Sequence, residues 1–410
     1  MVSENPVLIV GAGLSGLSCG CTLNDAGIPY LIFDKAVRVG GRVKTDVYDG
    51  YRLDVGFQVL LTQYPEAKRF FDYDSLELSR CYPGSLIWHG DRFHRFSDPL
   101  RRPWKSLASL FCPIGSFKDK IRIGMMRVGL LKTTSLTDDT STLEALRELG
   151  FGNSMIERFW RPFMGGVLLE KELSTSVRKF EETFHLFSKG YTTIPKMGIG
   201  ELPRQLAGNL DKDRLLLGRK VKSVTEREIK LESGDLLRGE SVVLAVEGSE
   251  SERMLGLENS TSWNSVECIY FGLPEKALPS REPILYLDGE GTGPINNLFF
   301  TSNLSDCAPK GKALASASVI SSKGTNKDED LVNAALNQLK KWFGASVNEW
   351  QLIKRYKIKE AIPMCFKPTT IHELKTNGIY QCGDYNGLPS LDAALKSGRL
   401  VAEKIIEDRK

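Results

Sequence analysis

The chain has 410 residues, more than one compact core usually accommodates, so its length predicts two domains. A content of 41% hydrophobic and 26% charged residues is that of an ordinary globular protein. The 55 basic and 51 acidic residues leave a net charge of only +4, which argues against nucleic acid as the principal partner. The eight cysteines and four histidines lack the spacing of a metal or redox site, so we assign no metal ligand.

The first residues, MVSENPVLIVG, enter a strand almost at once and leave no room for a signal segment. No apolar run approaches the ~20 residues that span a bilayer. We therefore expect a cytoplasmic protein, either freely soluble or associated with a membrane surface.

Residues 6–10, PVLIV, predict a strand that is buried on both faces of a parallel sheet. GAGLSG follows directly and places Gly11, Gly13 and Gly16 at GxGxxG spacing before a helix of small residues. A second strand, YLIFD, ends at Asp34. These glycines permit a tight turn, close approach to a pyrophosphate and close helix–strand packing, and an acid at this position accepts hydrogen bonds from an adenosine ribose. The order of elements predicts a dinucleotide-binding unit.

FDKAVRVGGR, at residues 33–42, and LDVGFQ, at residues 53–58, follow this unit. The first run resembles the E-x-x-x-R-x-GGR signature of flavin-containing amine oxidoreductases, a superfamily that includes monoamine oxidases, protoporphyrinogen oxidases and phytoene desaturases. The resemblance implies FAD, with Arg42 at the cofactor phosphates and the DVGFQ segment beside the flavin ring. Many members carry an arginine where this chain has Ala36, so one dinucleotide contact is either missing or supplied elsewhere.

Residues 91–132 contain ten Lys and Arg against three Asp, with aromatic residues interleaved, and Ser116 is placed to cap a helix within them. Such a segment suits the face of a protein that lies on an anionic membrane. The alternative is a helical lid that packs its apolar stripe inward and keeps its basic side in solvent.

ERFWRPFMGGV, at residues 157–167, resembles the F-x-x-P-x-x-x-G-V stretch that lines the substrate cavity of desaturases and protoporphyrinogen oxidases. The resemblance implies Arg158, Arg161 and Phe163 as substrate residues. The two arginines either bind a polar end of the substrate or pair with nearby glutamates.

Two later segments extend the resemblance to the family, and a third, rich in glycine, does not. Residues 193–210 resemble the family's P-x-G-G-x-x-x-L helix, after which the backbone of Val221 would hold the adenine. DGEGTGP, at residues 288–294, follows one strand and precedes another, so it predicts a hairpin and no second nucleotide site. CGDYNGLPSLDAALKSGR, at residues 382–399, resembles the C-terminal segment of phytoene desaturases: Asp384 would bind the ribitol and pyrophosphate region, and a helix from Ser390 would aim its N-terminal amides at the flavin pyrimidine.

The resemblance implies an α/β protein with a Rossmann-type FAD-binding domain and an interleaved α+β substrate domain of mixed sheet and helices. The FAD-binding domain would comprise residues 1–60, 190–250 and 375–410, and the substrate domain residues 61–189 and 251–374. The implied cofactor-binding residues are Gly11, Gly13, Ser15, Gly16, Asp34, Lys35, Gly41, Arg42, Gly56, Phe57, Gln58, Val221, Gly383, Asp384, Ser390 and Leu391.

Amine oxidases of this family usually place a lysine near flavin N5, in the strand that SVECIYF resembles, where this chain has Glu267 and Cys268. The resemblance therefore favours a phytoene desaturase-like enzyme that desaturates or otherwise oxidises an apolar, isoprenoid-like substrate by hydride transfer to N5 of noncovalent FAD. The alternatives are an amine oxidase using oxygen, and a flavoprotein isomerase, cyclase or binding protein without net redox turnover. The sequence assigns no catalytic side chain, electron acceptor or oligomeric state.

Overall fold

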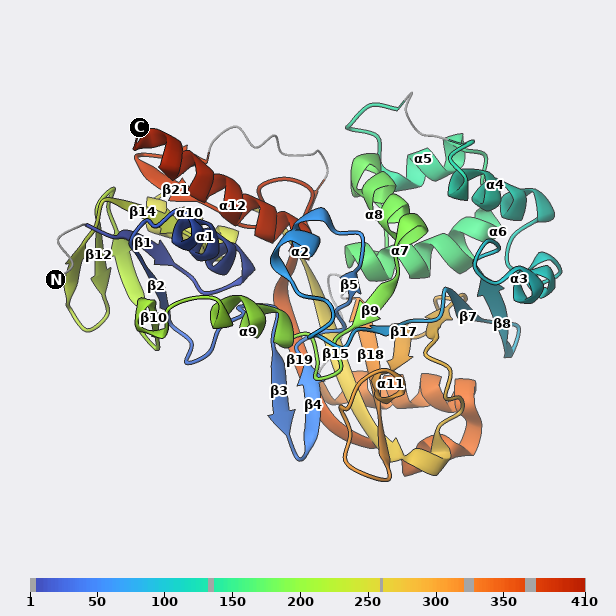
Figure 1. Ribbon diagram of the computed structural model, residues 1–410. Helices are drawn as coiled ribbons and strands as arrows, with labels where there is room; N and C mark the ends of the chain where they lie inside the picture. The colour runs from blue at the N-terminus through green and yellow to red at the C-terminus, as the bar shows by residue number, and fades with distance from the viewer. Residues whose placement is uncertain (1–4, 132–135, 259–260, 321–327, 366–373, 410) are drawn as a thin grey trace.

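The computed structural model describes residues 5–131, 136–258, 261–320, 328–365 and 374–409 (Figure 1). One layer is a six-stranded sheet whose strands come from both ends and the middle of the chain. In the order β10-β2-β1-β14-β21-β20 the strands are Leu215–Leu217, Tyr30–Asp34, Val7–Val10, Ser241–Leu244, Ile379–Gln381 and Lys375–Thr376. The first five are parallel, and β20 pairs antiparallel with β21. The two strands expected at the N-terminus are confirmed as parallel neighbours.

Strand β1 is buried along its whole length because both faces of this sheet are covered. Side chains alternate between the faces of a strand. Val7 and Ile9 accordingly pack in one cluster with helices α1, Leu14–Asp25, and α12, Leu391–Asp408. Leu8 and Val10 pack in another cluster with a small antiparallel sheet, whose strands β11, β12 and β13 are Val221–Val224, Glu228–Leu231 and Leu236–Arg238.

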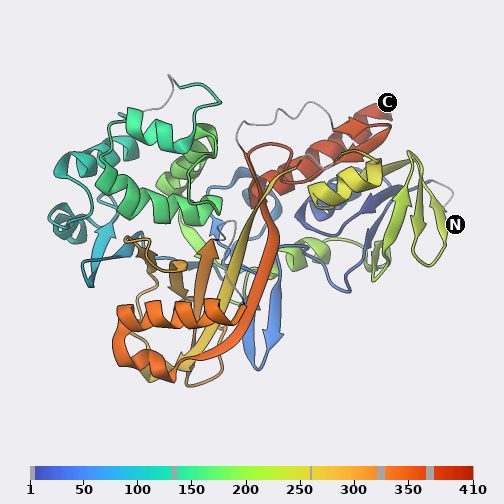
Figure 2. The ribbon, with the colours of Figure 1, turned by 180° about the vertical axis from the view of Figure 1, so that it is seen from behind.

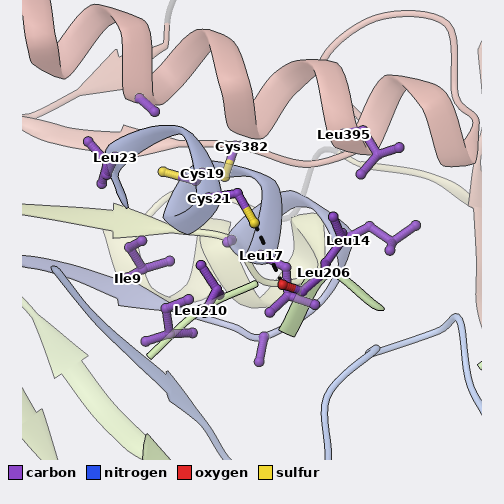
Figure 3. Packing of buried hydrophobic residues seen from close by; sticks show 14 of the residues in the cluster. Ile9, Leu14, Leu17, Cys19, Cys21, Leu23, Leu206, Leu210, Cys382 and Leu395 are labelled. Carbon is purple, nitrogen blue, oxygen red and sulfur yellow. Dashed lines mark hydrogen bonds between the residues drawn. The ribbon is translucent and has the colours of Figure 1, made fainter. Parts of the chain in front are cut away.

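Helices α1 and α12 lie side by side and join the two ends of the chain (Figure 3). A Cβ on Gly398 would stand 2.0 Å from the carbonyl oxygen of Ser15, so only glycine permits this close approach. The Ser18 hydroxyl donates to the Leu395 carbonyl across the contact at 3.0 Å. Cys19 and Cys382 are free, buried thiols in the same cluster (Figure 3). Gly398 thus permits the close packing of the two terminal helices.

The second layer is a seven-stranded sheet in the order β19-β15-β18-β17-β16-β7-β8, with helix α11, Asp328–Phe343, packed in its hydrophobic cluster (Figure 2). Strands β16 and β17 pair antiparallel, which confirms the hairpin predicted at residues 288–294. In the sheet order the strands are Gln351–Pro363, Trp263–Pro274, Lys312–Ile320, Ile295–Phe300, Leu285–Asp288, Gly84–His89 and Arg92–Ser97.

A group of helices covers one end of this sheet, on the side away from the six-stranded sheet (Figure 1). The predicted cap at Ser116 is confirmed, because its hydroxyl accepts from the Asp119 amide. The Ser141 hydroxyl caps the next helix in the same way by accepting from the Glu144 amide. Helices α3 to α8 are Pro103–Leu110, Phe117–Arg127, Thr142–Glu148, Asn153–Met155, Arg161–Leu168 and Val177–Lys189, with a π-helical turn over Ile156–Trp160.

The architecture is the α/β fold that the sequence predicted, while the residue limits of the two domains stay a prediction. Within the described ranges, no helix is long and apolar enough to cross a membrane. The remaining elements are α2 Pro65–Phe70, α9 Glu201–Gly208, α10 Gly248–Leu255, β3 Thr45–Tyr48, β4 Tyr51–Asp54, β5 Leu60–Leu61, β6 Ser79–Arg80, β9 Thr192–Ile194 and short 3-10 turns.

Candidate functional site

The glycine loop lies between the end of β1 and the start of α1. Gly11 has φ of +114°, and a Cβ there would stand 2.3 Å from the Ala245 carbonyl oxygen. A Cβ on Gly16 would stand 1.9 Å from the carbonyl oxygen of Gly11. A Cβ on Gly13, in contrast, would meet no atom within 4 Å, and Gly13 lines a large cavity. Two glycines therefore hold the turn and the helix together, and the middle one leaves room for a ligand.

Asp34 ends β2 beside this loop. One carboxylate oxygen accepts from the Ala12 amide and the other from the Ala36 amide, both at 2.7 Å. Each carboxylate oxygen has two lone pairs, so Asp34 can brace the loop and still accept from a ribose hydroxyl.

Arg42 and Asp384 join the two ends of the site across 342 positions of sequence. The guanidinium donates to both carboxylate oxygens, one of them at 2.9 Å, and also to the Ala361 carbonyl at 3.1 Å. Burial lowers the pKa of Arg42, but the charge and hydrogen bonds of Asp384 outweigh it, and the net pKa is raised. The pair fixes the last segment of the chain against the GGR turn.

The DVGFQ segment, at residues 54–58, is fixed by contacts of Gln58 and Phe57. The Gln58 amide donates to the Arg42 carbonyl at 3.0 Å and to the Val55 carbonyl at 2.9 Å. The ring of Phe57 lies 5.2 Å from that of Phe299, centroid to centroid. These contacts orient the DVGFQ turn along the cavity.

At the other end, Ser390 caps α12 by accepting from the Ala393 amide at 3.0 Å. The Gly383 amide donates to the Ser397 hydroxyl at 3.1 Å. Asp392, in the first turn of α12, accepts from the Ala67 amide, and burial raises the pKa of its carboxyl to about 6. The N-terminus of α12 is thereby fixed against α2 and faces the cavity.

Two cavities meet at this point. The larger one, about 860 Å³, runs along the glycine loop and the Arg42–Asp384 pair. The second, about 530 Å³, lies among α3, α4, α7, α8 and strands β7 and β8. The wall that the two cavities share is formed by Phe57, Gln58, Gly166, Leu169, Ile362, Ser390 and Leu391.

The second cavity has a largely apolar wall. Phe163 stacks on Phe159 with ring centroids 5.3 Å apart and lies 5.5 Å from the ring of Phe187. Other aromatic residues of this wall are Tyr64, Tyr82, Phe96, Trp160, Phe184 and Phe299. A cavity of this size and lining suits a small apolar molecule.

All of the predicted cofactor residues except Gly16, which packs beneath the loop, line the larger cavity. Of the predicted substrate residues, Phe163 lines the apolar cavity. Arg158 instead donates to the Pro113 carbonyl at 2.7 Å, and Arg161 forms an ion pair with Glu157 at 2.6 Å. Neither arginine lines either cavity, so the pairing alternative describes Arg161.

Sequence reasoning missed two parts of the site. Residues 245–247, directly after β14, line the larger cavity, as does the end of β19 at residues 357–362. The first could have been found, because ligands of parallel sheets bind at the carboxyl ends of the strands. Cations absent from the predicted set also line this cavity: Arg38, Lys44, Arg219, Lys220, Lys357 and Lys359. Of these, Arg38 follows Ala36 by two positions, and Arg219 is held beside it because the Arg219 amide donates to the Asp34 carbonyl at 2.8 Å.

The larger cavity fits the FAD that the resemblance implies. It places open space over Gly13, the amide end of α1, the acid Asp34 and several cations along one continuous surface. This donor set suits a pyrophosphate flanked by a ribose.

The strand β15 carries no lysine at residues 266–271. Val266 lines the larger cavity, while Glu267 pairs with Arg355 and the Cys268 thiol lies 3.3 Å from the Ser316 hydroxyl.

Comparison with known proteins gives a consistent result. The family described as "flavin containing amine oxidoreductase" matches residues 14–406. The chain is 27% identical to protoporphyrinogen oxidase 2 of Arabidopsis thaliana over 40% of its own length and 33% of that protein. It is 22% identical to a 15-cis-phytoene desaturase of an Oncidium hybrid cultivar over 98% of its length and 78% of that protein. Among solved structures, an oxidoreductase from Methanosarcina mazei is similar with a TM-score of 0.74 and 18% identity, covering 98% of this chain and 100% of the other.

Proposed function

Because this chain belongs to the family of flavin containing amine oxidoreductases, with FAD as its cofactor, we propose that it desaturates or otherwise oxidises an apolar, isoprenoid-like substrate. The observation that carries the proposal is the wall shared by the two cavities. A molecule in the aromatic cavity would meet the redox end of a cofactor in the larger one at Phe57, Gly166 and Leu391.

The residues predicted from the sequence would hold FAD. Asp34 would accept from the adenosine ribose, and the amides after Gly13 would face the pyrophosphate. Arg42, already paired with Asp384, would add positive charge beside the phosphates. The backbone of Val221 would meet the adenine. We propose that the protein binds FAD noncovalently.

When bound, FAD would serve as the acceptor of a hydride from the substrate. The protein positions the substrate and excludes water from the site. The capped N-terminus of α12 presents backbone amides at Leu391, where a helix end stabilises negative charge. The aromatic wall around Phe159, Phe163 and Phe187 orients an apolar substrate toward that end and keeps solvent away from it.

Two observations favour this proposal over amine oxidation. The strand β15 offers no lysine at residues 266–271. The apolar cavity is lined by four cationic side chains and one acid within the described part of the chain, so a protonated amine would be repelled. The four cations are Arg101, Lys120, Arg127 and Lys179, and the acid is Asp98.

We further propose that α3 and α4 rest on an anionic membrane. On α4, Ile123 and Met126 pack against the core, but Phe117 and Ile121 point outward and are exposed to 59% and 47%. Trp104 and Phe111 nearby are exposed to 84% and 89%. A lid that packed its apolar stripe inward would bury these side chains. Exposed apolar residues beside Lys105 and Lys118 suit an interfacial surface. Residues 132–135, which include the end of the basic segment, lie outside the described residues.

The proposed function is tested by anaerobic reduction of the bound flavin. The purified protein is mixed with phytoene in detergent or, separately, with putrescine and benzylamine, and the visible flavin absorbance is followed. We expect bleaching by the polyene and none by the amines. Rapid bleaching by an amine would establish the oxidase instead, and a flavin that no reductant of either class bleaches would favour the isomerase or binding protein.

A further inference from the structure

The apolar cavity has one charged end. Among the described residues, Arg101, Lys120 and Arg127 line it there together with a single carboxylate, Asp98. Lys120 and Arg127 lie on α4, and Asp98 and Arg101 come just before α3. Seven positions separate the two α4 side chains, which is two helical turns, so both point to the same side.

Asp98 is fully engaged by its nearest partners. One carboxylate oxygen accepts from Arg127 Nε at 3.1 Å and lies 3.8 Å from Arg101 Nε. The other oxygen accepts from the amides of Leu100 and Arg101 at 2.9 and 3.3 Å. The negative charge of Asp98 is thus shared between two guanidinium groups, and Asp98 forms no ion pair with Lys120.

Lys120 is buried, with 9% of its surface exposed. Its ammonium donates to the carbonyls of Leu110 and Cys112 at 2.8 and 2.6 Å. An ammonium has three N–H groups, so one donor stays available toward the cavity. Within the described ranges Lys120 forms no ion pair. A buried cation without a counter-charge is costly, and an anion that enters the cavity would supply one.

Arg101 is in a similar position. It donates to the Ser188 carbonyl at 3.1 Å and to the Gly190 carbonyl. Burial lowers the pKa of Arg101, Asp98 opposes this shift, and the neighbouring positive charge of Arg127 adds to it. The lowered pKa of Arg101 reflects chiefly the burial of its guanidinium.

Helix α8 runs along the cavity and places its charged end. Arg101 contacts Ser188, near the C-terminal end of α8. At the opposite end of α8, the Ser176 amide donates to the Cys365 carbonyl at 2.8 Å, three residues beyond Ile362 of the shared wall. Lys179 and Ser188 both line the cavity, and the rise of an α-helix sets them about 14 Å apart along α8. The rings of Phe163, Phe184 and Phe187 lie along the cavity wall.

We propose that the cluster of Arg101, Lys120 and Arg127 binds an oxyanion at one end of the substrate. The substrate class is then an elongated apolar molecule that ends in a carboxylate or a phosphate. This inference rests on the proposed function, because it names the substrate of the same site. It also explains why three cations gather at one end of a largely apolar cavity.

The test measures binding to the FAD-loaded protein by calorimetry and by the change in flavin absorbance. The three probes share one chain and differ only at the end: dodecanoate, dodecyl phosphate and dodecanol. We expect at least one of the two anions to bind about tenfold or more tightly than the alcohol, the gain of one charged hydrogen bond. The stronger of the two anions identifies the head group.

Lys120→Met should abolish the preference for the anion and leave dodecanol binding unchanged, and Lys120→Arg should restore it. Lys118→Met is the matched control, because Lys118 lies on the same helix but is exposed. If Lys120→Met does not fold, as judged by circular dichroism, Arg127→Met carries the same test.

Equal binding of alcohol and anions, or an unchanged preference in Lys120→Met, would overturn the oxyanion site while leaving the apolar cavity and the oxidoreductase intact. If none of the probes binds although the protein retains flavin, the oxyanion site and the apolar-substrate proposal both fail.

Discussion

Replacing Asp384 by Ala removes the partner of a partly buried guanidinium. In the structure Asp384 has 9% of its side chain exposed and Arg42 has 30%, and two hydrogen bonds join them. A hydrogen bond to a charged group contributes about 1.5–3 kcal/mol, and breaking a buried pair costs about 3–5 kcal/mol. Because Arg42 keeps solvent contact and its bond to the Ala361 carbonyl, we expect a loss at the lower end, about 2 kcal/mol.

The loss should appear in two measurements. Urea unfolding of the FAD-free protein measures the loss of stability from breaking the ion pair. The ratio of flavin to protein after purification measures whether Arg42 still holds the cofactor. Asp384→Asn, which keeps one acceptor, should lie between wild type and Asp384→Ala. Asp306→Ala is the control, because Asp306 is exposed in a loop. Equal flavin content in Asp384→Ala and Asp306→Ala would refute the role of this pair in the cofactor site.

Three further outcomes are expected. Gly398→Ala should destabilise the protein in urea unfolding and lower its flavin content, since the new Cβ would stand 2.0 Å from a backbone oxygen. Gly208→Ala in α9 is the control: a Cβ there meets nothing within 4 Å, so this variant should be neutral or stabilising by up to about 1 kcal/mol. Burial raises the pKa of Asp392 to about 6 from about 3.9 in the unfolded chain, so the folded state binds the proton more tightly and stability falls as pH rises from about 4 to 6. Asp392→Asn should therefore be more stable than wild type at pH 7 by about 1–3 kcal/mol, and an advantage that persisted below pH 4 would contradict this cause. Trp104→Ser should weaken sedimentation with anionic vesicles, and Leu236→Ser, at another exposed apolar site on β13, should not; equal effects would remove the membrane proposal.

The sequence alone was enough for the dinucleotide unit. The buried strand, the three glycines, the small-residue helix and Asp34 fall within about thirty consecutive residues, and each has a local physical requirement. The helix starts at Ser116 and Ser390 were equally predictable, because a hydroxyl that accepts from an amide two or three residues on is a local interaction.

Tertiary structure decided the rest, because it depends on contacts between distant parts of the chain. The bond from Arg42 to Asp384 spans 342 positions, and no local pattern specifies it. The basic segment shows the same limit more sharply. Its composition predicted cations on the surface, yet in α4 Lys120 turns inward and Phe117 turns outward. Successive residues of a helix point in different directions, and only the neighbours against which the helix packs determine which side faces the cavity.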